Sequence, residues 1–163
     1  MRRRSALPTS FAWIAALGFA LLGLSGCGPD QPAQFDTPAA AFSAYKKALE
    51  AEDLDQAWLC YSSSFRDGVY KGEMATWVKD QNERNKAWIK NEANRQIADE
   101  KIINQRIAYL LFDATTLESN RVSPFFYFIK ETEGWKITTH LDSTFHQELE
   151  KAIERGEFVL PAG

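Results

Sequence analysis

The sequence predicts an α+β fold in which N-terminal helices pack on a curved antiparallel sheet and a further helix follows the sheet. Three observations support this prediction. Apolar residues recur at intervals of three and four from residue 37 to about 93, short apolar runs separated by turn-like residues extend from 102 to 141, and helical spacing returns at 143–155. The 137 residues that follow position 26 are enough for one domain.

The first helix is expected to begin at Thr37, because its hydroxyl can cap free amides and Pro38 suits the first helical position. Phe42, Tyr45 and Leu49 then lie on one helical face. After an acidic break at residues 52–53, a second apolar pattern includes Leu54, Ala57, Trp58 and Tyr61. Two short helices or one bent helix fit this stretch.

A serine run at 62–64 is predicted to end the second helical pattern, and Gly68 and Gly72 are predicted to bracket a loop. From residue 73 to about 93 the chain is rich in good helix formers and carries an intermittent apolar stripe. This stretch predicts a third helix.

The strands of an antiparallel meander are predicted from short runs rich in Ile, Phe, Tyr, Thr and Leu. The turn at 131–134 predicts a hairpin, because four polar or small residues separate two strongly apolar runs. The predicted strand runs are residues 102–103, 107–117, 122–130 and 135–141.

Both faces of this sheet are expected to be covered. Ile107, Tyr109 and Leu111 point to one side of their strand, yet the residues between them are equally apolar. The early helices can cover only one face, so the second face requires the C-terminal helix or another subunit. We therefore predict a homodimer as one way of covering it.

The C-terminal helix is predicted from Phe145, Leu149 and Ile153, which recur at helical spacing within residues 143–155. Ser143 or Thr144 is expected to cap its start, and Gly156 follows its end.

An export leader is predicted at residues 1–26. Three arginines at positions 2–4 precede an uncharged run of fourteen residues at 11–24, and small Ser25 and Gly26 lead into Cys27. A helix that spans a membrane needs about 20 apolar residues, so this run is too short to be assigned as one. The segment resembles a bacterial lipoprotein signal peptide.

This resemblance implies cleavage between Gly26 and Cys27, with Cys27 carrying a diacylglycerol and, in many bacteria, an acyl chain such as palmitate on its amino group. Residues 27–36 would then form the lipidated N-terminus and tether, and 37–163 the domain. The protein would lie in the cell envelope. With Gly28 after the cysteine, the resemblance implies the outer membrane facing the periplasm in an organism with two membranes, and otherwise the outer face of the cytoplasmic membrane.

The charge of the chain after the leader limits its partners. Sixteen basic residues then face 22 acidic ones, a net charge of −6, because three of the 19 Lys and Arg residues leave with the leader. This charge argues against nucleic acid or an anionic lipid surface as a partner. Cys60 would have no cysteine to pair with, and its apolar surroundings favour a buried small hydrophobe over a reactive thiol.

A second resemblance rests on the Thr37-Pro38 helix start with Tyr45 and Ala48 on one face, the acidic break at Asp53, and the strand Gly134-Trp135-Lys136-Ile137. With helices first and a curved sheet after, residues 36–142 resemble the nuclear transport factor two-like superfamily, and in particular its small bacterial lipoproteins. The resemblance implies a cone with an apolar pocket, which some members use as an isomerase or dehydratase site and others use for binding.

Candidate site residues follow from this pocket. Tyr45, Trp58, Tyr109 and Tyr127 are candidates for its lining, although packing of aromatic residues in the core is the alternative. Asp113 shares strand parity with Tyr109, so it could be a general base with a raised pKa, or it could simply end its strand and cap a turn.

Metal and cofactor sites are not predicted. His140 and His146 are the only histidines, and no cysteine or third histidine completes a zinc shell with them. No Gly-rich phosphate loop, Cys-x-x-Cys pair or Gly-x-Ser-x-Gly motif occurs.

Trp88, among polar neighbours, is a candidate for an exposed interface residue.

We therefore expect a membrane-anchored exported lipoprotein that binds a small apolar ligand or an envelope protein without catalysis. The alternative is an isomerase or dehydratase with Asp113 or His140 as base and a tyrosine such as Tyr109 as acid. A deep pocket with the base near a tyrosine would favour the enzyme, and a filled interior would favour an interaction module.

Overall fold

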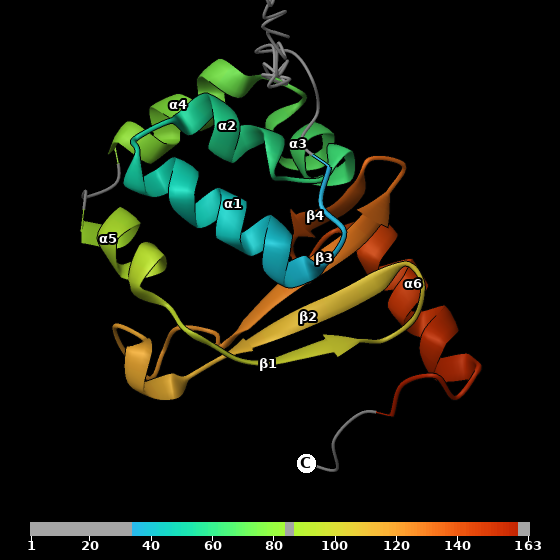
Figure 1. Ribbon diagram of the computed structural model, residues 1–163. Helices are drawn as coiled ribbons and strands as arrows, with labels where there is room; N and C mark the ends of the chain where they lie inside the picture. The colour runs from blue at the N-terminus through green and yellow to red at the C-terminus, as the bar shows by residue number, and fades with distance from the viewer. Residues whose placement is uncertain (1–33, 84–86, 160–163) are drawn as a thin grey trace, which may run out of the picture. The chain divides into compact units, whose positions relative to one another are not determined.

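The structure, a computed structural model, describes residues 34–83 and 87–159 of the 163-residue chain. Within these residues, helices are followed by a four-stranded antiparallel sheet and then by a C-terminal helix (Figure 1), which confirms the predicted α+β class. The predictions for the leader 1–26, the cleavage site Gly26-Cys27 and most of the tether lie outside the described residues.

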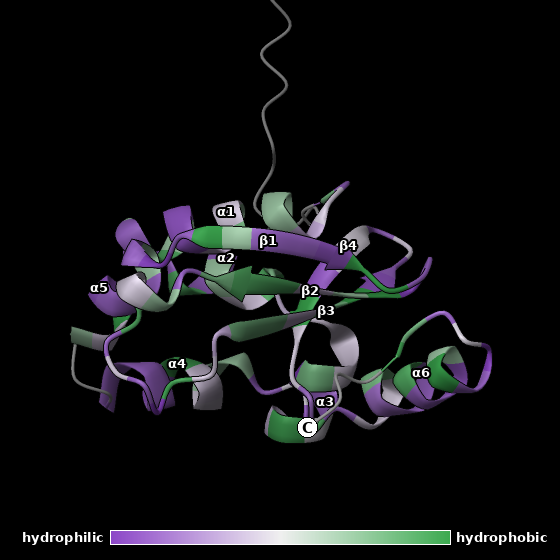
Figure 2. Cartoon of the chain, turned by 90° about the horizontal axis from the view of Figure 1, so that it is seen from below, coloured by the Kyte–Doolittle hydropathy of each residue, from purple (hydrophilic) through white to green (hydrophobic). Residues whose placement is uncertain are grey.

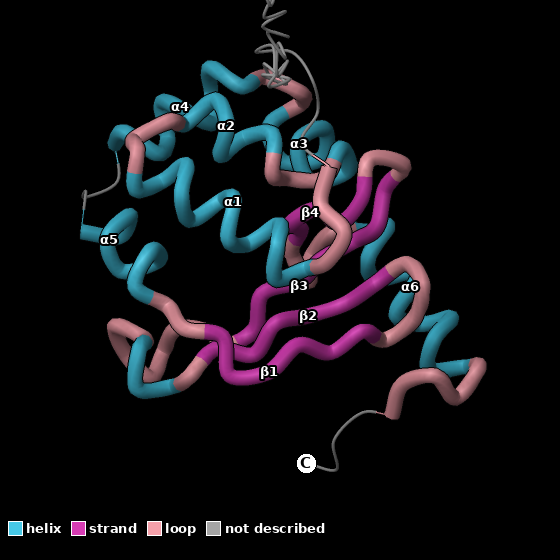
Figure 3. Tube along the Cα trace, in the orientation of Figure 1, coloured by secondary structure: helices cyan, strands magenta, loops and turns pink. Residues whose placement is uncertain are grey.

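Figure 3 shows the order of these elements along the chain. They are α1 Pro38–Glu50, α2 Leu54–Leu59, α3 Ser63–Tyr70, α4 Met74–Glu83, α5 Ala87–Asn94, β1 Ile97–Ile102, β2 Ile107–Phe112, a short 3₁₀ helix η1 Ala114–Thr116, β3 Phe125–Glu131, β4 Gly134–Thr138 and α6 Ser143–Glu154.

The first two helices begin where the sequence predicts. The Thr37 hydroxyl accepts a hydrogen bond from Ala40 N at 3.0 Å, and Pro38 is the first residue of α1. Glu52 has a left-handed φ of 54° between α1 and α2, and Asp53 caps α2. The two helices are therefore separate.

The serine run follows the end of α2, as predicted, but it also begins a further helix, so the prediction that Gly68 and Gly72 bracket a loop is wrong at Gly68. The Ser62 hydroxyl accepts a hydrogen bond from Phe65 N at 3.1 Å and caps α3. Gly68 lies inside α3, and the chain leaves the helix at Lys71, which has a left-handed φ of 55°. Of the third predicted helix, the structure describes α4 and α5 and leaves residues 84–86 undescribed.

The sheet is the predicted meander, in the order β1-β2-β3-β4. The predicted hairpin is present, because β3 ends at Glu131 and β4 begins at Gly134. The first strand is longer than its predicted run at 102–103. It starts at Ile97 and carries three charged residues in a row, Asp99, Glu100 and Lys101, as an exposed edge strand can. The prediction missed it because no apolar alternation marks such an edge.

The two faces of the sheet bury two apolar clusters. Toward the helices, Ala108, Leu110 and Phe112 of β2 join α1 in the larger core. On the opposite face, Ile107 of β2 and Ile129 of β3 pack with Phe145 of α6, so α6 covers part of the second face as predicted. Figure 2 shows β2 and β3 in green, the colour of hydrophobic residues, as expected for strands with apolar residues on both faces.

The residue that caps the start of α6 differs from the prediction. The cap of α6 is Asp142, not Ser143 or Thr144, because the Asp142 carboxylate accepts from Thr144 N at 2.8 Å and Phe145 N at 3.1 Å.

Cys60 is a buried free thiol, and burial raises its pKa to about 12, so it is neutral at physiological pH.

Candidate functional site

Among the described residues, a cavity with several aromatic walls lies where the helical layer meets the end of the sheet. We call it the aromatic pocket. Its volume is about 700 Å³, within the range of small-molecule sites. The lining residues that matter here come from the helical layer, from the segment after α2 and from β3, and they are Tyr45, Tyr61, Trp77, Trp88, Glu92 and Phe126.

Three of these side chains form a hydrogen-bonded chain that we call the tyrosine relay. Tyr61 Oη donates to Tyr45 Oη at 3.0 Å, and Tyr45 Oη donates to Glu92 Oε2 at 3.4 Å. Arg95 Nη1 donates to the other oxygen, Glu92 Oε1, at 2.8 Å, which makes a short charge-assisted pair. The relay thus connects the pocket wall to a buried ion pair.

Secondary structure holds each member of the relay in place. Tyr45 projects from α1 and is fully buried. Tyr61 follows α2 and is fixed by an isolated bridge to Ile137 of β4, while its ring stacks on Phe65 at 4.5 Å between ring centres. Glu92 comes from α5, which packs against α1. The relay therefore depends on the assembly of three separate segments.

Burial changes the acidity of both phenols. It is the main cause that raises the pKa of Tyr45 and of Tyr61 above the ordinary value, and the negative charge of Glu92 raises the pKa of each further. Both hydroxyls therefore keep their protons at neutral pH and can donate.

These shifts predict that the protein loses stability at alkaline pH. Because the folded pKa of each tyrosine lies above its unfolded value near 10, the stabilisation is fully present below about pH 10 and is lost as the pH rises toward the folded pKa. Each tyrosine adds a slope of up to about 1.4 kcal/mol per pH unit in that window. Chemical denaturation between pH 8 and 11 measures it.

The matched pair for this measurement is Tyr45→Phe and Tyr109→Phe. Tyr45→Phe should show a shallower loss above pH 10 than the wild type, and Tyr109→Phe, which lies outside the relay, should keep the wild-type slope. Equal slopes in all three proteins would contradict the assignment.

The rim of the aromatic pocket carries His140 and Asp142. His140 is exposed. Asp142 is buried, but its carboxylate caps α6 and accepts from Thr138 Oγ1 at 2.8 Å. Among the described residues, neither side chain is hydrogen-bonded to a tyrosine of the relay, and the ring centre of His140 lies 5.9 Å from that of Tyr127 on the sheet.

Asp113 lies at the end of β2, where it caps η1 and accepts from Thr115 N at 2.8 Å. Hydrogen bonds from the Thr115 side chain and backbone lower its pKa, the opposite of the raised value that a general base would need. It is absent from the lining of the aromatic pocket. Asp113 therefore ends its strand and caps a turn, which was the alternative to its being a general base.

The four predicted lining residues do not come together. Tyr45 lines the pocket, whereas Trp58 packs in the core, 5.5 Å from Trp77 between ring centres. Tyr109 and Tyr127 lie on the opposite face of the sheet with α6. The pocket residues that sequence reasoning missed are Tyr61, Trp77 and Glu92, and Trp88 lines the pocket in a half-buried position.

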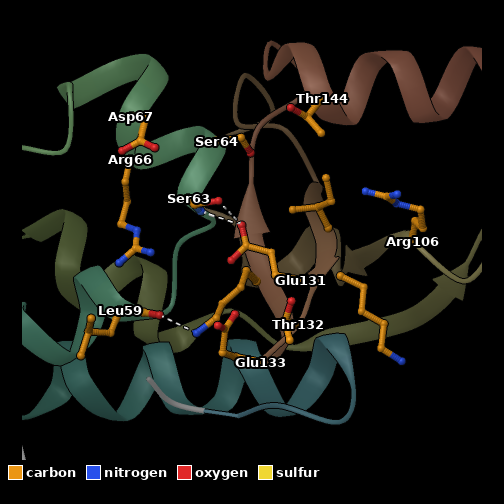
Figure 4. Close-up of a pocket in the computed structure, with 13 residues that line it drawn as sticks. Leu59, Ser63, Ser64, Arg66, Asp67, Arg106, Glu131, Thr132, Glu133 and Thr144 are labelled. Atoms are coloured by element: carbon orange, nitrogen blue, oxygen red, sulfur yellow. Dashed lines mark hydrogen bonds between the residues drawn. The ribbon is translucent and has the colours of Figure 1, made fainter. Parts of the chain in front are cut away.

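A second cavity of about 560 Å³ lies beside the β3–β4 hairpin (Figure 4), and we call it the polar pocket. There Glu131 Oε1 accepts from Ser63 N and Ser63 Oγ, both at 2.7 Å. Lys136 Nζ donates to the Leu59 carbonyl at 2.9 Å, and burial lowers the pKa of this lysine. These bonds join α2 and α3 to the hairpin, so Ser63, Glu131 and Lys136 serve as structural contacts.

Over 34–83 and 87–159, no three His, Cys, Asp or Glu side chains gather as metal ligands would. Across the described part of the chain, every helix is too short or too polar to cross a membrane.

No family model matches this chain, and neither a curated protein nor a solved structure is significantly similar to it.

Proposed function

We propose that this chain is an exported, lipid-anchored protein whose folded part binds a small, largely apolar molecule in the aromatic pocket, without catalysis. The observation that carries the proposal is the pocket itself, in which aromatic walls stand beside the hydrogen-bonded tyrosine relay. Small-molecule sites commonly have this composition, with few polar groups that orient the ligand.

The anchor is part of the proposal and rests on the sequence. The arginine start, the apolar run at 11–24 and the Ser25-Gly26-Cys27 site resemble those of a bacterial lipoprotein. We also propose that residues 36–142 have the cone arrangement of the nuclear transport factor two-like superfamily. The order of helices before a meander and the Gly134-Trp135 hairpin strand support this proposal.

An isomerase or dehydratase is the second candidate, and the tyrosine relay is the observation that favours it. A phenol at a pocket wall can stabilise an oxyanion by donating its proton, but the protons of Tyr61 and Tyr45 are already donated to Tyr45 and Glu92. Such an enzyme also needs a base within hydrogen-bond reach of the substrate. Asp113 caps a turn and Asp142 caps α6, so binding accounts better for the described residues.

A substitution that fills the pocket tests the binding proposal. Gly68 lines the aromatic pocket, and a Cβ atom added there would meet nothing within 4 Å, so a side chain can begin at this position. We expect Gly68→Trp to weaken binding of fluorobenzene at least about fivefold, because the indole competes for the pocket. The measurement is ligand-observed ¹⁹F NMR with the full chain in detergent, corrected for a detergent blank.

The matched control is Asp67→Trp. Asp67 is the preceding residue of the same helix and lines the polar pocket instead. The Asp67→Trp variant should therefore bind fluorobenzene as tightly as the wild type does. Absence of binding in the wild type, or equal weakening in both variants, would contradict the proposed site.

A further inference from the structure

The hydrogen bonds of the tyrosine relay all run in one direction. A phenol has one proton to donate, and an ionised carboxylate only accepts. Tyr45 therefore uses its proton on Glu92, and Tyr61 uses its proton on Tyr45. What remains at Tyr61 Oη for a bound molecule is a lone pair.

The ion pair at the far end sets this direction. Arg95 carries a permanent positive charge, and its Nη1 donates to Glu92 Oε1 at 2.8 Å. Both side chains of this pair are largely buried, with 10% and 13% of their surface exposed. Reversing the relay would require Glu92 to donate a proton to Tyr45, which the charged partner disfavours.

The end of the relay that a ligand can meet is Tyr61. Tyr45 is fully buried, whereas Tyr61 is partly exposed and lines the aromatic pocket. Around it stand the rings of Phe65 and Trp77, at 4.5 and 5.8 Å between ring centres. A ligand that reaches this point therefore meets a hydrogen-bond acceptor framed by apolar surface.

We propose that the aromatic pocket selects ligands that donate a hydrogen bond from an uncharged hydroxyl or N–H group on an apolar body, and that it disfavours carboxylates. A phenol or alcohol can donate to Tyr61 Oη. A carboxylate would bring its lone pairs against those of Tyr61, within a field already made negative by Glu92. This inference rests on the proposed function, because it names the class of ligand for the same pocket.

Three probes of similar size test it with the full chain in detergent: fluorobenzene, 4-fluorophenol and 4-fluorobenzoate, titrated by ¹⁹F NMR at pH 7. In the wild type, 4-fluorophenol should bind about 3- to 10-fold more tightly than fluorobenzene, the range expected for one net hydrogen bond. The benzoate should bind more weakly than fluorobenzene.

Two variants separate the relay from other polar groups on the rim. Tyr61→Phe should remove the preference for the phenol and leave fluorobenzene binding within about twofold of the wild type. Glu92→Gln should raise the affinity for 4-fluorobenzoate relative to 4-fluorophenol, because an amide can donate to Tyr45 and allow Tyr61 to donate into the pocket. Thermal melts monitor folding of each variant.

The outcomes distinguish this inference from the function on which it rests. Fluorobenzene that binds without any preference for the phenol, or a benzoate that binds as tightly as the phenol, overturns the relay inference and leaves the pocket in place. A wild-type chain that binds none of the three overturns the proposed function and the inference together. Retention of the phenol preference in a folded Tyr61→Phe variant also overturns the inference.

Discussion

Gly134→Ala is expected to destabilise the protein by about 2 to 6 kcal/mol, the sum of a strained backbone and an overpacked contact. Gly134 has a φ of 112°, a conformation that residues with a Cβ rarely adopt. An added Cβ would lie 2.3 Å from Phe35 O and 2.8 Å from Phe35 N. The obstacle is backbone, so no side chain can rotate away from it.

The contact matters because Gly134 and Phe35 form a bridge at the start of β4, where Trp135 N donates to Phe35 O at 2.8 Å. Alanine would have to open this bridge or distort the hairpin. Equilibrium unfolding in urea measures the change in the free energy of unfolding.

The control is Gly68→Ala, which places the same methyl group inside α3. An added Cβ there meets nothing within 4 Å, so the variant should be more stable than the wild type by up to about 1 kcal/mol. A Gly134→Ala protein as stable as the wild type would contradict the close approach of Phe35.

Cys27→Ser is expected to abolish attachment of lipid and release the protein from the membrane fraction. Each buried methylene of an acyl chain contributes about 0.8 kcal/mol, so two or three chains hold a protein for its lifetime and their loss removes the anchor. The measurement is growth of the expressing bacteria with labelled fatty acid, followed by membrane fractionation.

The control for the anchor is Cys60→Ala, since Cys60 is the second of the two cysteines in the chain. Its thiol is buried and its Sγ contacts Gln56 O at 3.4 Å, so the variant should keep the lipid label while losing some stability. Label that persists in Cys27→Ser would overturn the lipoprotein proposal and leave the pocket proposal standing.

Local patterns predicted much of the fold because they act over a few residues. Thr37 with Pro38 located the start of α1, and the 131–134 turn located the β3–β4 hairpin. The serine run was predicted only to end the second helical pattern, because a serine serves equally as a helix cap and as a loop residue. The hydrogen bond that Ser62 accepts from Phe65 N shows that it also begins α3.

The candidate site was harder to predict because its members are far apart in the chain. Tyr45 was identified as a lining residue, but its partner Glu92 is 47 residues away and stands in a polar stretch like any exposed helix residue. Tyr109 and Tyr127 were grouped with Tyr45, although they lie on the other face of the sheet. Parity along a strand says which residues share a face, but not which face the helices cover.

Short-range chemistry in the chain was thus sufficient for the α+β class, the starts of α1 and α2 and the hairpin, because each depends on residue patterns that are local in the sequence. Which carboxylate accepts from which phenol depended on how α1, α5 and the Tyr61 bridge to β4 assemble. The same assembly buries both phenols, which raises the pKa of Tyr45 and of Tyr61. It also places the two hydroxyls so that Tyr61 donates to Tyr45 and Tyr45 donates to Glu92 at the wall of the pocket.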